Sequence, residues 1–316
     1  MKSPPILDPD LRRLLETVFA GAPDDVQTDV GRLRAATEEA PRVLGGEPEV
    51  LSSVANAQAP GPAGSIPLRI YRPDAPAPLP LVLYAHGGGW MTGSLDSHDR
   101  LCRKLARALP ALLVSVDYRR APEHVYPAAL DDVEAAWRWS HEQAAALGAD
   151  GARFAVAGDS SGGNLAAALT LRLRASAVPQ PRLQLLLYPA LDATCSRASY
   201  REFATGYNLA GAQMAWYWDA YRAGAARNAP ELSPLAAADL AGLPPAVIAV
   251  AEADVLRDDG LDYARRLAEA GVQVRVVRCD GMIHGFLRWT GAVPAARRWI
   301  ETIAAAAGEI LRLRAA

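Results

Sequence analysis

A serine placed between glycines is the residue of this chain best suited to nucleophilic chemistry. It occurs in the segment Gly-Asp-Ser-Ser-Gly at 158–162. A short, mostly apolar run at 153–157 precedes this segment, and a stretch rich in helix-forming residues at 164–175 follows it. The glycines permit a sharp turn between a strand and a helix, and such a turn exposes the serine hydroxyl. Only Ser160 has glycine both two residues before and two residues after it. The pattern therefore predicts Ser160 as the nucleophile.

The positions of the five histidines favour one of them as the general base. His284 follows the last predicted strand and precedes the final predicted helix, where a loop can carry an imidazole to the serine. His98 and His141 lie within or at the ends of predicted helices, which favours solvated positions. His86 precedes three glycines and is expected to fix their loop, and His124 falls in a proline-containing loop. His284 is thus the predicted base.

An acidic group must hold the imidazole in the correct tautomer and stabilise its charged form. The predicted strand at 246–251 is followed by Glu252 and Asp254, in the position where such an acid is needed. Asp254 lies further out in the loop and fits better. The residues alone leave Glu252 as a competitor and Asp192, after an earlier strand, as a weaker one. The order serine, acid, histidine differs from the two common serine-protease orders.

Three consecutive glycines at 87–89 follow an apolar run at 81–85. Without side chains in the way, their backbone N–H groups can converge on one point and stabilise an oxyanion. We predict Gly88 and Gly89 as donors, joined by the N–H of Ser161, the residue after the nucleophile. A phosphate-binding loop is disfavoured, because no Gly-Lys-Ser/Thr follows and no well-spaced Gly-x-Gly-x-x-Gly occurs.

Length, charge and cysteine content are those of an ordinary soluble enzyme. The chain has 316 residues and a formal net charge of −2, which gives no electrostatic reason to expect nucleic acid or an anionic membrane as a partner. The three cysteines show no metal-binding spacing, and no signal-peptide pattern begins the chain. No stretch approaches the ~18 apolar residues of a membrane span. We therefore expect a cytoplasmic protein without a metal or an organic cofactor.

The elements that must position these groups alternate along the chain. Strands are predicted near 50–57, 66–71, 81–85, 111–116, 153–157, 183–187, 246–251 and 272–277. Helices are predicted near 97–109, 128–147, 164–175, 259–270 and 292–313. This alternation predicts an α/β fold with a mostly parallel sheet of about eight strands and helices on both faces. Residues 8–45 also carry helical spacing, and the aromatic-rich stretch 195–240 interrupts the alternation.

Taken together, the motifs resemble the hormone-sensitive-lipase-like α/β-hydrolases, the bacterial family IV carboxylesterases. The matching segments are His-Gly-Gly-Gly-Trp at 86–90, Tyr-Arg-Arg-Ala-Pro-Glu-His at 118–124, Tyr-Pro-Ala-Ala-Leu-Asp-Asp at 126–132, Gly-Asp-Ser-Ser-Gly-Gly-Asn at 158–164, Asp-Val-Leu-Arg-Asp-Asp-Gly at 254–260 and His-Gly-Phe at 284–286. The chain departs from the family at Arg120, where leucine is usual, at Val255, where proline is common, and at Ser161, where alanine is common.

The resemblance implies the α/β-hydrolase fold and a serine carboxylesterase acting on short- to medium-chain acyl esters. It implies Asp254 rather than Glu252 as the acid, and Gly88, Gly89 and Ser161 as the oxyanion donors. It also implies that residues 1–48 and an insertion at about 195–240 form a helical cap on a catalytic domain of residues 49–316. A homodimer is plausible on the same resemblance.

Four aromatic residues are candidates for the wall of a substrate pocket, although buried aromatics more often belong to the core. They are Trp90, Tyr188, Tyr207 and Trp216. Two other functions stay open. One is an amide-directed serine hydrolase of the aryl-formamidase or N-/O-deacetylase type, because the serine chemistry is shared. The other is a non-catalytic small-molecule receptor on the same fold, against which the intact His284 argues.

Overall fold

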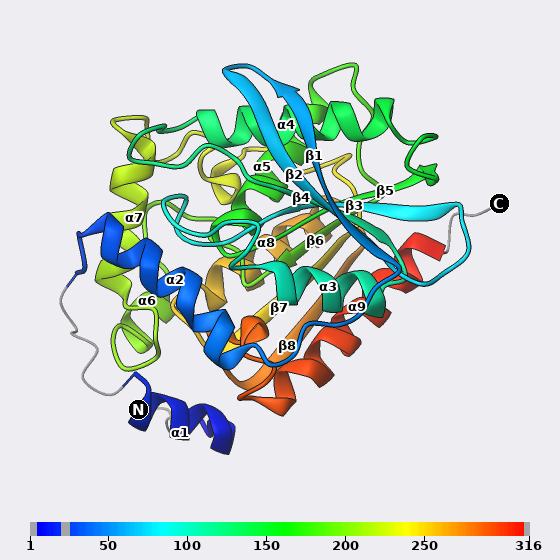
Figure 1. Cartoon of the computed structure of the whole chain (residues 1–316). Helices are drawn as coiled ribbons and strands as arrows, with labels where there is room; N and C mark the ends of the chain where they lie inside the picture. Colours follow the sequence, from blue (N-terminus) through cyan, green and yellow to red (C-terminus); the bar gives the residue numbers. More distant parts are fainter. Residues whose placement is uncertain (1–4, 20–25, 313–316) are drawn as a thin grey trace.

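Eight strands form one sheet through the described residues, 5–19 and 26–312, of the computed structural model (Figure 1). The strands are β1 (Ser53–Gly61), β2 (Gly64–Arg72), β3 (Leu79–Ala85), β4 (Leu112–Val116), β5 (Ala149–Asp159), β6 (Leu183–Leu187), β7 (Ala246–Ala253) and β8 (Val274–Ile283). Across the sheet they run in the order β1-β2-β4-β3-β5-β6-β7-β8. The pairs β1–β2 and β2–β4 are antiparallel, and the other pairs are parallel. The mostly parallel sheet predicted from the sequence is confirmed.

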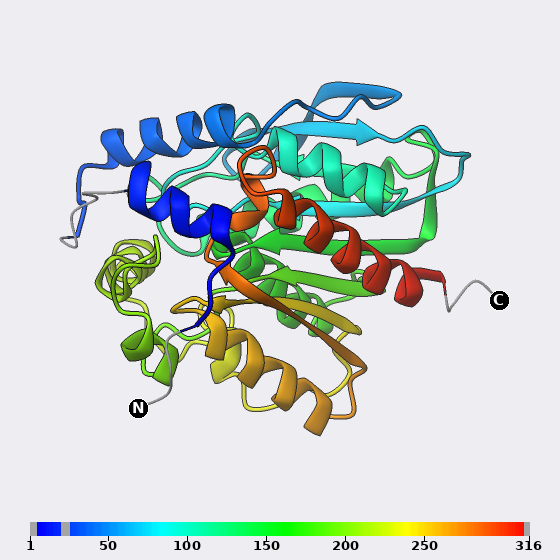
Figure 2. The same cartoon turned by 90° about the horizontal axis from the view of Figure 1, so that it is seen from below.

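Five of the described helices cover the two faces of this sheet. They are α3 (Asp99–Ala108), α4 (Ala128–Glu142), α5 (Ser161–Arg174), α8 (Arg257–Glu269) and α9 (Pro294–Arg312). Helices α3 and α9 contact each other on one face, and α4 and α5 contact each other on the opposite face, as Figures 1 and 2 show. Because both faces are covered, the central strands are continuous apolar runs rather than alternating ones.

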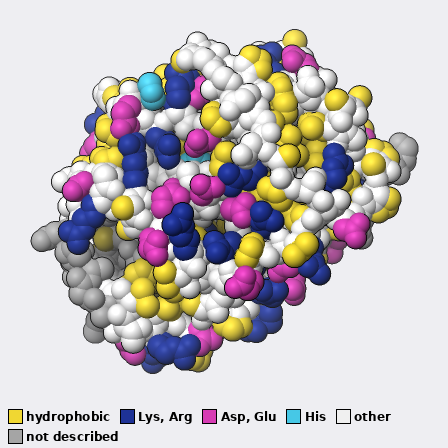
Figure 3. Space-filling view, viewed as in Figure 1, with side chains coloured by type: hydrophobic (Ala, Val, Ile, Leu, Met, Phe, Trp, Pro, Cys, Tyr) yellow, Lys and Arg dark blue, Asp and Glu magenta, His cyan; other side chains and the backbone are white. Residues whose placement is uncertain are grey.

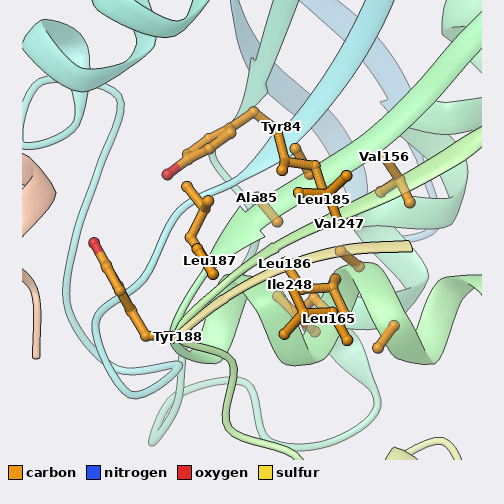
Figure 4. Close-up of a cluster of buried hydrophobic side chains, with 14 of the residues drawn as sticks. Tyr84, Ala85, Val156, Leu165, Leu185, Leu186, Leu187, Tyr188, Val247 and Ile248 are labelled. Atoms are coloured by element: carbon orange, nitrogen blue, oxygen red, sulfur yellow. The ribbon is translucent and has the colours of Figure 1, made fainter. Parts of the chain in front are cut away.

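The core lies between the central strands and these helices. All five residues of β6 are buried, and so are those of β4. Figure 4 shows Leu186 of β6, Ile248 of β7 and Leu165 of α5 in one aliphatic cluster, with the rings of Tyr84 and Tyr188 to one side of it. This rigid core fixes the carboxyl ends of the parallel strands, where ligands bind in open α/β sheets.

Four further helices gather at one end of the molecule, beyond those strand ends (Figures 1 and 2). They are α1 (Pro9–Thr17), α2 (Val30–Leu44), α6 (Ala198–Glu202) and α7 (Gly211–Arg222). Aspartates cap the first two, since Asp8 accepts from the N–H of Asp10 and Asp29 accepts from that of Arg32, both at 3.0 Å. The helical spacing predicted over 8–45 is therefore two capped helices, with residues 20–25 outside the described part.

The distribution of charged side chains on the surface agrees with the nearly balanced charge of the sequence. On the face shown in Figure 3, basic and acidic side chains lie interspersed among apolar ones. Among residues 5–19 and 26–312, no helix is long and apolar enough to cross a membrane. Cys102 and Cys279 are buried, Cys195 is half-buried, and all three are free thiols.

Candidate active site

Ser160, His284 and Asp254 form one continuous hydrogen-bonded chain. His284 Nε2 lies 2.9 Å from Ser160 Oγ, and His284 Nδ1 lies 2.8 Å from Asp254 Oδ2. The three residues follow β5, β7 and β8, whose carboxyl ends meet at one edge of the sheet. Strand β8 runs to Ile283, past its predicted end at 277, so His284 is held directly at the end of the strand.

The backbone at Ser160 is the strained turn predicted from its flanking glycines. Ser160 adopts φ 56° and ψ −119°, a conformation that is costly for a residue with a side chain and is typical of functional turns. A Cβ on Gly162 would overlap the carbonyl oxygen of Ala85, and a Cβ on Gly158 would overlap the backbone of Gly162. Both glycines are therefore required for α5 to approach the central strands this closely.

The competing acids are bound elsewhere. Glu252 accepts a hydrogen bond from the N–H of Gly281 at 2.7 Å, and Asp192 lies 3.1 Å from Arg197 Nε. Asp254 Oδ1 accepts from the N–H of Leu256 at 2.9 Å, which leaves its Oδ2 directed at the imidazole. The structure thus brings Asp254, and neither competitor, to His284.

The glycine loop offers two free N–H groups beside the serine. The N–H of Gly87 donates to Asp159 Oδ1 at 2.8 Å. The N–H groups of Gly88 and Gly89 make no hydrogen bond to any residue of the described part of the chain. Ser161 is the first residue of α5, where a backbone N–H has no intrahelical acceptor. These three donors are the ones predicted for an oxyanion.

Asp159, the residue before the nucleophile, is the main functional feature that the sequence analysis missed. Its buried Oδ1 accepts from the Tyr84 hydroxyl at 2.7 Å and from Gly87, and it lies 3.4 Å from His98 Nε2. Burial favours a raised pKa for Asp159, but the nearby His98, Arg288 and Tyr84 outweigh it and lower the pKa below its ordinary value. This carboxylate ties the serine turn to the glycine loop.

His98 corrects the expectation of a solvated position, because its side chain is fully buried. Its ring lies 5.4 Å from that of His86, which is stacked on Tyr118 at 4.3 Å. Burial, and next the neighbouring His98, lower the pKa of His86 to about 3, so this ring is neutral at neutral pH. His86 Nδ1 lies 2.9 Å from the Gly87 carbonyl, and the Tyr118 hydroxyl donates to the His86 carbonyl at 2.7 Å. His86 holds the loop, as expected.

Replacing Asp159 with alanine is expected to reduce the free energy of unfolding by about 3 kcal/mol, because it leaves the Gly87 N–H and the Tyr84 hydroxyl buried without an acceptor. Urea unfolding of wild type and Asp159→Ala measures this difference. Asp159→Asn keeps an oxygen acceptor and is the matched control, expected to lose less. An alanine variant as stable as wild type would contradict this role for the carboxylate.

A cavity of about 590 Å³ opens onto Ser160 and His284, a size typical of small-molecule sites. The loops and helices around it supply the described lining residues Val18, Phe19, Gln27, Arg32, Leu33, Ala36, Gly89, Asn208, Leu209, Ala210, Gln213, Met214, Tyr217 and Arg288. A reciprocal pair of hydrogen bonds joins the segment before α2 to α7, since the Gln27 N–H donates to Gln213 Oε1 at 2.8 Å and Gln213 Nε2 donates to the Gln27 carbonyl at 3.2 Å.

None of the four aromatic candidates belongs to the described wall of this cavity. Trp90 is buried and stacked on Tyr221 at 4.5 Å, and Tyr207 packs against Phe203 at 5.2 Å. Tyr188 is also buried, with its ring 5.0 Å from that of His284.

Trp216 is half-buried beside Tyr217, and Tyr217 is the aromatic residue that reaches the site from α7. A Cβ on Gly89 would come within 2.5 Å of the Tyr217 ring, so this ring lies against the glycine loop. Helical periodicity could have identified it, since Gln213, Met214 and Tyr217 share one face of α7.

Arg120, where the family usually has leucine, also contacts this region. Its guanidinium donates to the Gly93 carbonyl, and the neighbouring Ala121 N–H donates to the Trp90 carbonyl at 2.9 Å. The loop of residues 118–124 therefore packs directly on the loop that carries the glycines.

The fold and the geometry of the site are those of a known protein family. Residues 82–288 match the model of a family described as alpha/beta hydrolase fold. The chain belongs to the hormone-sensitive-lipase-like group, bacterial family IV, of the α/β-hydrolases, a family of carboxylic ester hydrolases. The resemblance inferred from the motifs is confirmed.

Named relatives cover almost the whole chain. The carboxylesterase NlhH of Mycobacterium tuberculosis is 42% identical over 299 residues, which are 92% of each protein. The ethyl acetate hydrolase of Pseudomonas putida is 39% identical over 295 residues, 89% of this chain and 92% of that protein. A solved structure of a thermostable esterase from Pseudomonas putida ECU1011 has a TM-score of 0.91 and 37% identity, covering 99% of this chain and 100% of that one.

Proposed function

We propose that this protein is a serine carboxylesterase that hydrolyses short- to medium-chain acyl esters through Ser160, His284 and Asp254. The observation that carries the proposal is the hydrogen-bonded chain from Asp254 Oδ2 through both ring nitrogens of His284 to Ser160 Oγ. In such a chain the serine has a base within reach and the base has a group that orients it. Carboxylesterases among the relatives support the same reaction.

In the first half of the reaction, Ser160 Oγ attacks the ester carbonyl carbon while His284 Nε2 takes the hydroxyl proton. The carbonyl π electrons move to oxygen, and the N–H groups of Gly88, Gly89 and Ser161 stabilise the resulting oxyanion. When the tetrahedral intermediate collapses, the bond to the alcohol oxygen breaks and His284 gives its proton to the leaving alcohol. An acyl-enzyme on Ser160 remains.

In the second half, the same groups act on water. His284 removes a proton from a water molecule, whose oxygen attacks the acyl carbon, and the same three N–H groups bind the second oxyanion. Collapse breaks the bond to Ser160 Oγ, which recovers its proton from His284. Asp254 keeps the Nδ1 proton of His284 in place and stabilises the imidazolium in both halves. The products are a carboxylic acid and an alcohol.

We further propose that residues 1–48 and about 195–240 form a cap that selects the substrate for the catalytic domain of residues 49–316. The proposal is supported by the cavity wall, to which the segment after α1 contributes Phe19, α2 contributes Leu33 and α7 contributes Tyr217. The free, mostly buried thiols are in keeping with a cytoplasmic location. A homodimer stays a prediction, and an equilibrium sedimentation measurement tests it.

The experiment that tests the activity compares hydrolysis of p-nitrophenyl acetate, butyrate, octanoate and palmitate by wild type and Ser160→Ala. The expected result is fast turnover of the acetate and butyrate, slow turnover of the palmitate, and loss of all turnover in the variant. A folded wild type no faster than the variant on every ester would overturn the proposal. A matched pair of an ester and an amide with the same acyl group then separates an esterase from an amide-directed hydrolase.

Gly88→Ala is expected to lower kcat by about 100-fold with little change in KM, because it disturbs a donor that acts on the transition state. Gly88 has φ +125°, and a Cβ there would overlap the Thr92 carbonyl oxygen, so the loop must shift. Steady-state kinetics on p-nitrophenyl butyrate measure the effect. Gly151→Ala is the control, since nothing lies within 4 Å of its added Cβ. Equal kcat in the two variants would exclude Gly88 as a donor.

A further inference from the structure

The described wall of the cavity above Ser160 carries cationic side chains and no anionic ones. Arg288 and Arg32 belong to its wall, and none of the described lining residues is an aspartate or a glutamate. Arg288 ends the short 3-10 helix η2 (Phe286–Arg288), immediately after His284 and Gly285, and it is half-buried. Arg32 is exposed on α2. The described wall of the cavity therefore carries two cationic side chains that can attract an anion.

Among the described residues Arg288 has no carboxylate within ion-pair distance, unlike several other half-buried arginines. Arg34 is paired with Glu123 at 2.7 Å, and Arg172 with Glu231 at 2.7 Å. No ion pair joins Arg288 to any carboxylate of residues 5–19 and 26–312, and its buried Nε has no hydrogen-bond acceptor there. Arg288 is close enough to Asp159 to lower the pKa of that carboxyl, but it makes no direct ion pair with it. Because a buried donor without an acceptor is costly, the guanidinium is a place where an anionic ligand would be stabilised.

The position of the guanidinium places this charge beside the reacting groups. A Cβ on Gly285 would lie 3.3 Å from Arg288 Nη2 and 3.9 Å from Asn208 Nδ2, so both donors flank the residue after His284. The Asn208 amide also donates to the His284 carbonyl at 3.2 Å. An ester bound at Ser160 therefore has a fixed cation and an amide donor within the same cavity.

We infer that the cavity binds esters that carry a carboxylate in addition to the reacting ester group, with Arg288 as the residue that binds the carboxylate. This inference rests on the proposed esterase function and names its substrate class. A guanidinium binds a carboxylate through two parallel, charge-assisted hydrogen bonds. A single half-buried arginine balances one negative charge, which favours a monocarboxylate over a phosphate. Arg32, exposed on the wall, adds to the attraction of an anion into the cavity.

The test compares two esters that differ only in this charge, mono-4-nitrophenyl adipate and its neutral methyl ester, methyl 4-nitrophenyl adipate. The measured quantity is the ratio of their kcat/KM values, corrected for spontaneous hydrolysis. Wild type is expected to favour the anionic ester, and Arg288→Met to lower the ratio by about tenfold, the loss typical of a hydrogen bond to a charged group. Arg288→Lys keeps the positive charge but lacks the two parallel N–H donors of a guanidinium, so it should retain part of the preference for the anionic ester.

The control variant is Arg278→Met, which removes an exposed arginine of β8 outside the cavity wall and should keep the wild-type ratio. A wild type that favours the neutral ester, or an Arg288→Met variant with the wild-type ratio, would overturn the inference. An Arg288 that acts only on the field at Asp159 and His284 would lower kcat/KM of both esters equally, which also overturns it.

Binding measurements separate failure of this inference from failure of the esterase proposal. In the Ser160→Ala background, calorimetry gives the affinities of both adipate esters without turnover. Tighter binding of the anionic ester, lost on adding Arg288→Met, supports carboxylate recognition whatever the rates are. Equal affinities together with rapid hydrolysis of the neutral ester by wild type would overturn the inference and leave the esterase function intact. Equal affinities without any hydrolysis would overturn both.

Discussion

Ser160→Ala is expected to lose about 10⁶-fold in kcat on p-nitrophenyl butyrate, because it removes the hydroxyl that lies 2.9 Å from His284 Nε2. KM is expected to change little, since the alanine removes only an oxygen and leaves the cavity wall in place. Active-site labelling with a fluorophosphonate, which reacts with activated serines, provides a second readout and should be absent in the variant. A variant that keeps one per cent of wild-type kcat would exclude Ser160 as the nucleophile.

The control for this experiment is Ser161→Ala, which restores the residue common in the family next to the nucleophile. Its side chain is buried, and its proposed contribution is the backbone N–H, which alanine retains. Activity within a few-fold of wild type is therefore expected. A loss as large as that of Ser160→Ala would point to Ser161 as the reacting hydroxyl.

Asp254→Asn is expected to lower kcat by about 10⁴-fold, because the amide favours the wrong tautomer of the imidazole and cannot stabilise its charged form. The hydrogen bond from the Leu256 N–H at 2.9 Å can be made by an amide oxygen, so the geometry of the loop is kept. Stopped-flow or steady-state turnover of p-nitrophenyl butyrate measures the loss, with circular dichroism to establish that the variant is folded.

Glu252→Gln is the matched control for the acid. Glu252 lies on the same strand end but accepts from Gly281 rather than from His284, so its amide should leave kcat within a few-fold of wild type. The reverse pattern, a large loss with Glu252→Gln and a small one with Asp254→Asn, would mean that the two carboxylates exchange roles in solution.

The reacting groups could be predicted from the sequence because each depends on a local backbone feature. Glycines on both sides of Ser160 encode the sharp turn, and three glycines in a row encode the exposed N–H groups of the loop. The alternation of strands and helices then brings Asp254 and His284 to the same sheet edge. Local chemistry and the regular architecture were sufficient to predict the positions of Ser160 and His284. For the acid they left Glu252 and Asp192 as competitors of Asp254, and the family resemblance favoured Asp254.

The cavity wall could not be predicted in the same way, because it depends on which face each helix turns inward. Trp90 and Tyr217 both lie near the glycine loop. Trp90 is buried in the core, whereas the ring of Tyr217 packs against Gly89. Residue type alone does not predict which of these two positions an aromatic side chain takes. The burial of His98 could not be predicted for a similar reason, because the buried carboxylate of Asp159 that faces it comes from a distant part of the chain.

The reciprocal hydrogen bonds between Gln27 and Gln213 join segments 186 positions apart in sequence. They lie on the wall of the cavity, whereas Ser160, Asp254 and His284 stand on strand ends anchored in the sheet. On the proposed division into a cap and a catalytic domain, different stretches of the chain determine which ester binds and how it reacts. We therefore expect changes in the first helices or in α7 to alter which esters are hydrolysed while the reaction stays the same. We likewise expect a tag or truncation at the N-terminus to change specificity.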